Sequence, residues 1–285
     1  MSAPPRASET APDGAGRPRP AGPRVSVVTI SHDRARFLPE AIESVLAQSF
    51  TDWELILVDD GSTDGTEAVV APYAARDARV RYLRNETCCG IVRSRNRGLE
   101  AAGGEYVAVL DSDDAWCDPD KLRMQVEFLD GHQDHAIVGG GVVVVDARGR
   151  ETRRFQNPDT DRRIRATMLS RNPLAHSSVM FRREVALAIG GYGAEPSVAR
   201  LDANEYYALF LGIGCRAKMA NSPNPVLKYR SHGGNTSVLK RREQMRNSLD
   251  LILSHRRDYP NLHLAVARRL FRLWLYVLGG RLLKK

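Results

Sequence analysis

The apolar positions of the first half form short strand-like runs that alternate with helically spaced segments. The run VSVVTI (25–30) predicts a buried strand, and it ends in the polar letters SHDR. Helical spacing follows in Phe37, Leu38, Ala41, Ile42, Val45 and Leu46. Further strands are predicted at 54–60, 79–85 and 104–111, and further helices at 66–76 and 91–102. Strands that alternate with helices predict an α/β fold, with a parallel sheet covered on both faces.

The pattern of the second half is less regular. A helix is predicted at 119–130, and a strand at 139–146 follows a flexible glycine run. The polar, arginine-rich segment 151–172 is interpreted as a mobile connection. A strand and a short helix are predicted within 175–192, and a strand that runs into a glycine-rich loop within 224–237.

Shifts in composition divide the chain into three parts. Residues 1–23 are rich in proline, alanine and glycine, and they are predicted to form a disordered tail. Residues 24–238 are predicted to form one domain, with a first half at 24–122 and a second half at 123–238. Residues 239–285 are basic and predicted to form a helical tail.

Bulk properties describe an ordinary globular chain of 285 residues with a net charge of +8. Four irregularly spaced cysteines predict neither a disulfide framework nor a zinc site. The chain shows no apolar core of a secretory signal and no run of 18 apolar residues, so no ordinary membrane span is expected. We therefore expect a cytoplasmic protein.

Acidic residues follow three of the predicted strands, in SHDR, DDGSTD and DSDD. Ligands of open α/β sheets bind at the carboxyl ends of the strands. The stretch DSDD (111–114) suits a hard cation, because Mg²⁺ or Mn²⁺ prefers oxygen ligands and takes one or two carboxylates plus phosphate oxygens. The alternative is a helix N-cap or an Asx turn. A second acidic strand end favours the cation.

Phosphate-binding glycine motifs are absent, since the chain contains neither GxGxxG after the first strand nor GxxxxGK[ST]. A diphosphate would therefore be held by a metal and by arginine. Arg93, Arg95 and Arg97 precede the DSDD strand and are candidates. The alternative, favoured for at least two of them, is a solvated helix face.

Two stretches resemble glycosyltransferase family 2, whose members have the GT-A fold. They are VSVVTISHDRARFLPEAIESVLAQSFTDWELILVDDGSTDGT and GIVRSRNRGLEAAGGEYVAVLDSDD, and the second contains the family's R-N pair and its D-x-D motif. The resemblance covers roughly 25–122. It implies a Rossmann-like, mostly parallel sheet flanked by helices, here with a C-terminal helical extension.

The resemblance also implies that the first half binds a nucleotide-sugar. The residues that it places around the nucleotide-sugar are Ile30, Ser31, His32, Asp33, Asp60, Arg95 and Asp111. Among them, Asp60 would accept a hydrogen bond from the base, and Asp111 would lie near the ribose. Asp113 would ligate Mn²⁺ or Mg²⁺ at the diphosphate, while Asp114 is expected to support the turn. The chain departs from the family where His32 replaces Tyr and Asp33 replaces Asn.

The second half resembles the family through HSSVMFRREVALAIGGYG and NPVLKYRSH. The family's E-D pair then falls on Asn204 and Glu205, so Glu205 is the candidate general base and Asp202 the fallback. The alternative is that Glu205 is an acid on a helix surface. A further departure is Leu211, where the family often has arginine.

Two histidines are further candidates for the site, and one motif of the family is absent. His232, in YRSHGG, is a second candidate for metal or diphosphate binding, and a structural histidine is the alternative; His176 is a weaker candidate. The Q-x-x-R-W motif of processive family members is absent, which favours transfer of a single sugar.

The basic tail alternates arginines with apolar residues between 262 and 278. This pattern is typical of an amphipathic helix on an anionic membrane surface, here through 262–285, and the alternative is a helix packed on the domain. Membrane contact at the inner face of the cell membrane suits a polyprenyl-linked acceptor. Nucleic acid is not expected as a partner, because no binding fold accompanies the basic residues.

Two hypotheses follow. The first is an inverting, metal-dependent glycosyltransferase that moves one sugar, from a UDP-sugar or a similar donor, to a glycan or glycolipid in surface polysaccharide assembly. The second is a catalytically impaired nucleotide-sugar-binding protein of the same fold.

Overall fold

A computed structural model describes residues 22–194, 204–234 and 241–271 of the chain. The predicted disordered tail at 1–23 therefore lies almost wholly outside the described residues.

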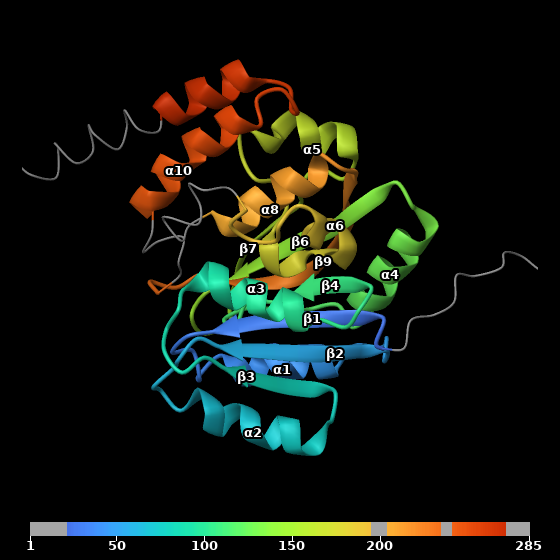
Figure 1. The fold of residues 1–285 in the computed structure, drawn as a ribbon, viewed down its shortest axis with the longest axis vertical. Helices are drawn as coiled ribbons and strands as arrows, with labels where there is room; N and C mark the ends of the chain where they lie inside the picture. Colours follow the sequence, from blue (N-terminus) through green and yellow to red (C-terminus); the bar gives the residue numbers. More distant parts are fainter. Residues whose placement is uncertain (1–21, 195–203, 235–240, 272–285) are drawn as a thin grey trace, which may run out of the picture.

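The elements of the first half follow the predicted alternation. In chain order they are β1 (Val25–Ser31), α1 (Leu38–Leu46), β2 (Trp53–Asp59), α2 (Thr66–Arg76), β3 (Val80–Arg84), α3 (Ile91–Ala101) and β4 (Tyr106–Val109). The four strands pair in parallel in the order β3-β2-β1-β4. The first half is thus the parallel α/β unit that the pattern predicts (Figure 1).

The chain after β4 continues the same sheet with mostly antiparallel pairs. Its elements are β5 (Ala115–Trp116), α4 (Lys121–Gly131), β6 (His135–Val145), β7 (Glu151–Phe155), α5 (Asp161–Met168), the 3-10 turn η1 (His176–Ser178), β8 (Met180–Arg182), α6 (Arg183–Ala188), α8 (Glu205–Gly214), β9 (Lys218–Arg230) and α10 (Arg241–Ser254). Strand β8 pairs antiparallel with β4 and β6, and so joins the two halves. The order continues β4-β8-β6-β9-β5, with β7 paired to β6.

The interpretation of 151–172 as a mobile connection is wrong. The segment contains strand β7, whose residues are all exposed, and helix α5. Helix α5 buries Ile164 and Met168 against the core and exposes Arg162 and Arg163, while Arg165 donates to backbone carbonyl oxygens at the end of α8. An edge strand and a short surface helix need few apolar residues, so their sequence resembles that of a loop.

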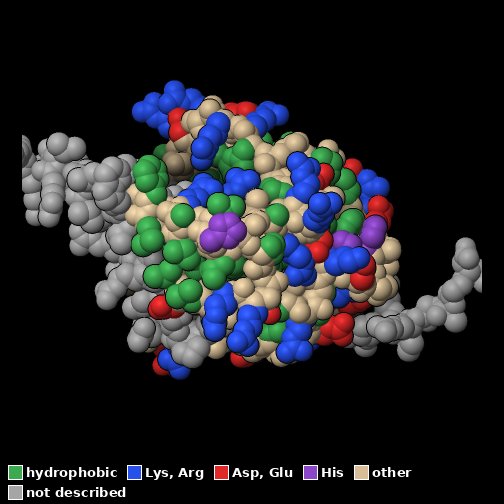
Figure 2. Space-filling model, turned by 90° about the horizontal axis from the view of Figure 1, so that it is seen from above, with side chains coloured by type: hydrophobic (Ala, Val, Ile, Leu, Met, Phe, Trp, Pro, Cys, Tyr) green, Lys and Arg blue, Asp and Glu red, His purple; other side chains and the backbone are tan. Residues whose placement is uncertain are grey.

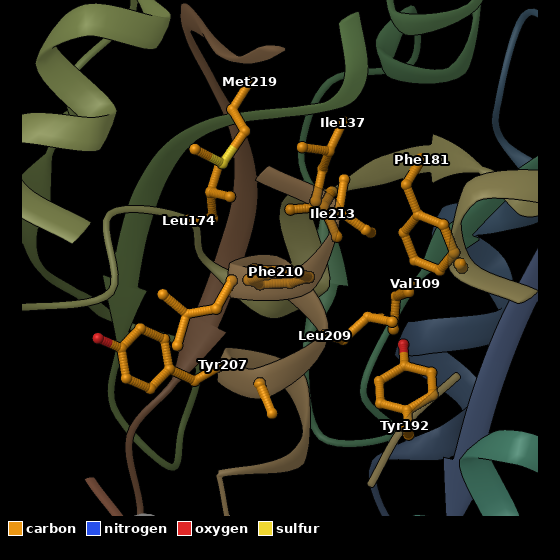
Figure 3. Packing of buried hydrophobic residues seen from close by; sticks show 14 of the residues in the cluster. Val109, Ile137, Leu174, Phe181, Tyr192, Tyr207, Leu209, Phe210, Ile213 and Met219 are labelled. Carbon is orange, nitrogen blue, oxygen red and sulfur yellow. The ribbon is translucent and has the colours of Figure 1, made fainter. Parts of the chain in front are cut away.

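Two hydrophobic cores lie on opposite faces of the sheet. Along β1 and β2, alternate residues point to opposite faces. Val27 and Leu55 join the core that packs under α1, α2 and α4. Val28 and Ile56 join the larger core, which α3, α5, α6 and α8 cover. Figure 3 shows side chains of that larger core, where residues of α8 such as Phe210 lie between strands and neighbouring helices.

The C-terminal helices pack on the larger core as far as they are described. Tyr259 and Ala265 are buried in it, the latter within the helical residues 262–271. Leu264, Leu270 and Phe271 of the same helix are exposed. Figure 2 shows this end of the molecule, where hydrophobic side chains gather close to lysine and arginine. The helix therefore packs on the domain with one side, and membrane contact of the other side stays a prediction, as does the boundary at 239.

None of the helices in the described ranges is long and apolar enough to cross a bilayer.

Candidate functional site

The polar turns after β1, β2 and β4 meet at one edge of the sheet. Because these neighbouring strands are parallel, their carboxyl ends lie on the same side. His32 Nδ1 lies 2.8 Å from the carbonyl oxygen of Asp60, and the amide of Thr63 donates to the Asp33 carboxylate over 2.8 Å. The turns after β1 and β2 are therefore tied together, as the sequence predicts for one shared site.

The turn after β1 has an uncommon backbone. Asp33 has a φ of 51°, in the left-handed region that asparagine and aspartate tolerate better than most residues. Ser31 is buried, and its hydroxyl has no hydrogen-bond partner within the described part of the chain. A buried hydroxyl without a partner is costly, and Ser31 is one of the residues that the resemblance places around the nucleotide-sugar. Ile30 lies beside it and is partly buried.

Asp60 is held by a loop that the sequence analysis did not single out. Its carboxylate accepts hydrogen bonds from Asn85 Nδ2 and the Cys89 amide, both at 2.8 Å, and from the Gly90 amide at 3.0 Å. Burial raises the pKa of Asp60, but these donors outweigh it and hold the pKa well below its ordinary value. Asp60 is therefore an ionised acceptor, 5% exposed.

The same loop packs closely on the strand end. A Cβ on Gly61 would lie 2.7 Å from the backbone nitrogen of Cys88, and Gly61 has a φ of 69°. Only glycine meets both conditions without strain. The thiols of Cys88 and Cys89 lie 3.3 Å and 3.1 Å from the two oxygens of the Asp60 carboxylate.

The three carboxylates of DSDD point to three different sets of partners. Asp114 is buried and accepts hydrogen bonds from the Ser177 hydroxyl at 2.6 Å and the Arg230 amide at 2.9 Å. Burial, together with Asp113 and Asp111 nearby, raises its pKa well above the ordinary value. Asp114 joins the strand end to η1 and β9, which is the supporting role expected of it.

Asp113 faces a histidine from the far half of the chain. His232 Nε2 lies 2.9 Å from the Asp113 carboxylate, and the amide of Gly234 donates to His232 Nδ1 over 3.1 Å. Because Nδ1 accepts, Nε2 carries the proton and donates to Asp113. The ring stacks on Phe37 with centroids 5.0 Å apart, and Arg34 Nε lies 4.0 Å from Asp113.

The donor set at Asp113 fits a divalent cation only in part. Among the residues that the structure describes, no group of three or more His, Cys, Asp or Glu side chains gathers to hold a metal. Asp113 nevertheless offers one oxygen, and His232 would offer one nitrogen once Nε2 gives up its proton to the solvent. Mg²⁺ and Mn²⁺ fit such an incomplete site when phosphate oxygens and water supply the remaining ligands.

Arg95 links the two halves of the chain. Its Nη2 donates to Asp111 and its Nε to Glu205, each over 3.0 Å. Arg95 is 4% exposed and Glu205 2% exposed, so both charges are buried and paired. Burial raises the pKa of Asp111, but Arg95 and His176 outweigh it and hold the pKa well below its ordinary value.

The other two arginines of α3 do not join this pair. Arg93 is exposed, and Arg97 donates to the carbonyl oxygen of Arg84 over 2.7 Å. Arg95 points inward, towards two carboxylates. Arg93 therefore lies on a solvated helix face, as expected for two of the three, whereas Arg97 is half-buried against the end of β3.

Glu205 begins helix α8, directly after a residue with an uncommon backbone. Asn204, with a φ of 64°, is in the left-handed region and turns the chain into the helix. The alternative interpretation of Glu205 as a surface acid is wrong, because the side chain is buried. Leu211 is buried in the core, so an apolar residue suits that position. Asp202 lies outside the described residues.

Two cavities lie away from the strand ends. One, of about 290 Å³, is lined by residues of α1 and α2, and the other, of about 400 Å³, by residues of α6, α8 and α10. Neither is lined by the aspartates described above. The segments 195–203 and 235–240, next to Glu205 and Gly234 in the sequence, lie outside the described residues.

Solved structures share this architecture. S. aureus TarS, residues 1–349 in complex with UDP, is 20% identical, with a TM-score of 0.61 over 81% of this chain and 65% of that chain. A mannosyltransferase from Pyrobaculum calidifontis, in complex with GDP-Man and Mn²⁺, is 16% identical, with a TM-score of 0.58 over 98% and 84%. At these identities the likeness shows the fold, which is the predicted GT-A type.

Relatives in sequence are also glycosyltransferases by name. The putative glycosyltransferase EpsE of Bacillus subtilis is 35% identical over 68% of this chain and 69% of its own length. The putative teichuronic acid biosynthesis glycosyltransferase TuaG of the same organism is 45% identical over 38% of this chain, which spans less than half of TuaG (42%). The model of "Glycosyl transferase family 2" matches residues 26–190, more than half of the chain. The chain belongs to glycosyl transferase family 2.

Proposed function

We propose that the chain transfers one sugar from a nucleoside-diphosphate donor, a UDP-sugar in the first instance, to an acceptor hydroxyl with inversion at the anomeric carbon. The observation that carries the proposal is the position of Arg95. Its guanidinium holds Asp111 of the donor half and Glu205 of the second half, each over 3.0 Å. A donor-binding carboxylate and a candidate base thus lie on two sides of one side chain.

The nucleoside would bind between the turns after β1 and β2. Ile30, Ser31 and His32 would line the base, with Asp33 beside them. Asp60 would accept a hydrogen bond from the N–H of the base, a role supported by its ionised carboxylate and by the loop amides that hold it in place. The UDP complex of TarS, a protein of the same fold, supports a uridine donor.

The diphosphate would bind near Asp113. Asp113 and His232 would hold Mn²⁺ or Mg²⁺, which, when bound, stabilises the negative charge of the departing diphosphate. Arg34 would add positive charge, since its Nε lies 4.0 Å from Asp113. Stacking on Phe37 and the amide of Gly234 fix the plane of the His232 ring.

Glu205 would act as the general base. Its carboxylate takes the proton from the acceptor hydroxyl while that oxygen forms a bond to the anomeric carbon. The bond between the anomeric carbon and the diphosphate oxygen breaks, and the electron pair leaves with the nucleoside diphosphate. A single displacement of this kind inverts the configuration, through an oxocarbenium-like transition state.

The acceptor would be a glycan or a polyprenyl-linked glycan in surface polysaccharide assembly, at the inner face of the cell membrane. The teichuronic acid biosynthesis named for TuaG supports this class of acceptor. The exposed apolar side chains of Leu264, Leu270 and Phe271, next to arginines, support membrane contact through 262–285.

The test is nucleotide-sugar hydrolysis and transfer with and without Mn²⁺, comparing the wild-type chain with Glu205→Gln over a panel of UDP- and GDP-sugars. Before the activity assay, the donors are ranked by the melting temperature of the chain, because a ligand that binds the folded state raises it. Mn²⁺-dependent release of nucleoside diphosphate that is lost in Glu205→Gln supports the proposal. Binding without turnover, over an adequate panel of acceptors, contradicts it.

A second candidate function is nucleotide-sugar binding without catalysis. The observation that favours it is the burial of Glu205, which is 2% exposed and paired with Arg95, so that an acceptor hydroxyl must reach a closed position. The same hydrolysis experiment decides between the two functions.

A further inference from the structure

A buried histidine lies between the donor-binding carboxylate Asp111 and the larger core. His176 Nδ1 lies 3.2 Å from the Asp111 carboxylate, and Nε2 lies 3.3 Å from the Tyr192 hydroxyl. The ring packs beside Tyr206 and Phe210, with centroids 5.2 Å and 6.0 Å away. The sequence alone makes His176 a weak candidate, because nothing in HSSVMF shows which side chain the ring would face.

The hydrogen-bond partners fix which ring nitrogen carries the proton. An ionised carboxylate can only accept, so Nδ1 must donate to Asp111, and Nε2 then accepts the proton of the Tyr192 hydroxyl. Burial and the nearby charge of Arg95 lower the pKa of His176, which keeps the ring neutral and in a single tautomer. Asp111 is therefore oriented from two sides, by Arg95 on one oxygen and by His176 on the other.

Tyr192 is held in turn by helix α3. The side-chain amide of Asn96 donates to the Tyr192 carbonyl and accepts from the Tyr192 amide, both over 2.8 Å. Gly191 has a φ of 70°, and a Cβ there would lie 2.6 Å from Asn96 Oδ1. Figure 3 shows Tyr192 at the border of the larger core with its hydroxyl directed inward. Arg95 thus fixes Asp111 directly. Its neighbour Asn96 acts indirectly, because it holds Tyr192, which contacts His176, which in turn contacts Asp111.

We propose that His176 is a positioning residue, whose Nδ1–H fixes the Asp111 carboxylate for nucleotide binding while the Tyr192 hydroxyl locks the ring tautomer. The proposal rests on the proposed function, in which Asp111 lies on the nucleoside side. It assigns His176 no contact with the substrate.

Two amide replacements separate this role from simple packing. In His176→Asn the side-chain amide replaces Nδ1 and keeps a donor for Asp111, whereas in His176→Gln the amide reaches towards the Nε2 position. A hydrogen bond to a charged group contributes about 1.5–3 kcal/mol, which corresponds to a roughly tenfold or larger loss of affinity. We expect His176→Gln to weaken binding of UDP with Mn²⁺ by at least about tenfold and His176→Asn to remain within about threefold of wild type.

The matched control is His255→Asn, which replaces another buried histidine, one that packs beside Tyr259 far from Asp111. It should lower the melting temperature about as much as the two His176 variants and leave UDP binding unchanged. Equal loss of UDP affinity in His176→Asn and His176→Gln, or no loss in either, overturns the proposal.

A measurement without nucleotide separates failure of this proposal from failure of the proposed function. Nitrogen-15 spectra of the free chain should show His176 with a protonated Nδ1 and an unprotonated Nε2 between neutral pH and mildly acid pH. The opposite tautomer overturns the positioning role, whatever the chain binds. A wild-type chain with the expected tautomer that binds neither UDP nor GDP in the presence of Mn²⁺ contradicts the proposed function, and the positioning role falls with it.

Discussion

The turns after β1 and β2 are held by contacts within the first half, whereas the turn after β4 and the side chain of Glu205 depend on partners far along the chain. Asp33 and Asp60 bind loops that lie about 30 residues away, at neighbouring strand ends. Glu205 pairs with Arg95 across 110 residues, and Asp113 contacts His232 across 119. The turns after β1 and β2 are therefore complete within the first half, while the turn after β4 is completed only when η1, α8 and β9 assemble against it.

The difference shows where catalysis and stability overlap. On the donor side, a carboxylate such as Asp60 is satisfied by amides of one loop. Between the halves, one buried guanidinium pairs with two carboxylates, so removing Arg95 leaves both carboxylates without that partner. Substitutions across the junction should therefore affect activity and folding together, and those within the donor turns mainly ligand binding.

The largest effect is expected from Glu205→Gln. The amide cannot take the acceptor proton, and loss of general-base catalysis lowers rates by about 100- to 10,000-fold. Steady-state transfer gives kcat, and UDP titration should show an affinity within about threefold of wild type. The control is Glu184→Gln, an exposed acid in the first turn of α6. If Glu205→Gln transferred sugar as fast as Glu184→Gln, Glu205 would not be the general base.

The second largest effect is expected from Arg95→Leu, which leaves Asp111 and Glu205 without the guanidinium. Breaking a buried ion pair by removing one partner costs about 3–5 kcal/mol, measured as the free energy of unfolding in urea. Arg93→Leu, on the exposed side of the same helix, should change it by less than about 0.5 kcal/mol. A similar decrease in the free energy of unfolding in Arg95→Leu and Arg93→Leu would show that the Arg95 ion pairs contribute little to stability.

The Asp113→Asn variant tests the metal. If Asp113 ligates the cation, UDP with Mn²⁺ should raise the melting temperature of the wild-type chain but not that of the variant. A ligand present at 100 times its Kd contributes about 2.7 kcal/mol, which sets the size of the effect in a thermal-shift experiment. Glu86→Gln, at an exposed position of the loop beside Asp60, is the control. An unchanged Mn²⁺ response in Asp113→Asn would refute the assignment.

The smallest effect is a pH dependence on the donor side. The folded-state pKa of Asp60 lies below its unfolded value, so its contribution to stability is present above the ordinary aspartate pKa and disappears as the pH falls below about 4. Asp60→Asn should therefore lower the free energy of unfolding at neutral pH, and the deficit should shrink on acidification. A deficit independent of pH would mean that packing, not charge, accounts for it.

Features that depend on local sequence could be predicted, whereas features that depend on distant partners could not. Alternation of strands with helices, and the acids that follow β1, β2 and β4, are local features, and they predicted the parallel unit and its polar edge. The prediction of a mobile connection at 151–172 is wrong because an edge strand and a surface helix bury few apolar residues. The direction of β8, antiparallel between β4 and β6, leaves no local signal.

The site shows the same division. The position of Asp60 at a strand end was predictable, but not the loop with Asn85 and Cys89 that holds it, since no motif marks a loop by its contacts. The inward direction of Arg95 and the partner of His176 depend on tertiary packing across the sheet. The family resemblance pointed to Glu205, and only the fold shows that Glu205 shares the Arg95 guanidinium with Asp111.

The central claim is that Asp111 and Glu205 share one guanidinium at the junction of the halves. A double-mutant cycle with Asp111→Asn and Glu205→Gln, followed by urea unfolding, tests it most directly. Residues in one ionic network depart from additivity by about 0.5–3 kcal/mol, which is the predicted result, whereas Asp60→Asn combined with Glu205→Gln should be additive. Additivity of Asp111→Asn and Glu205→Gln within about 0.5 kcal/mol would contradict the claim.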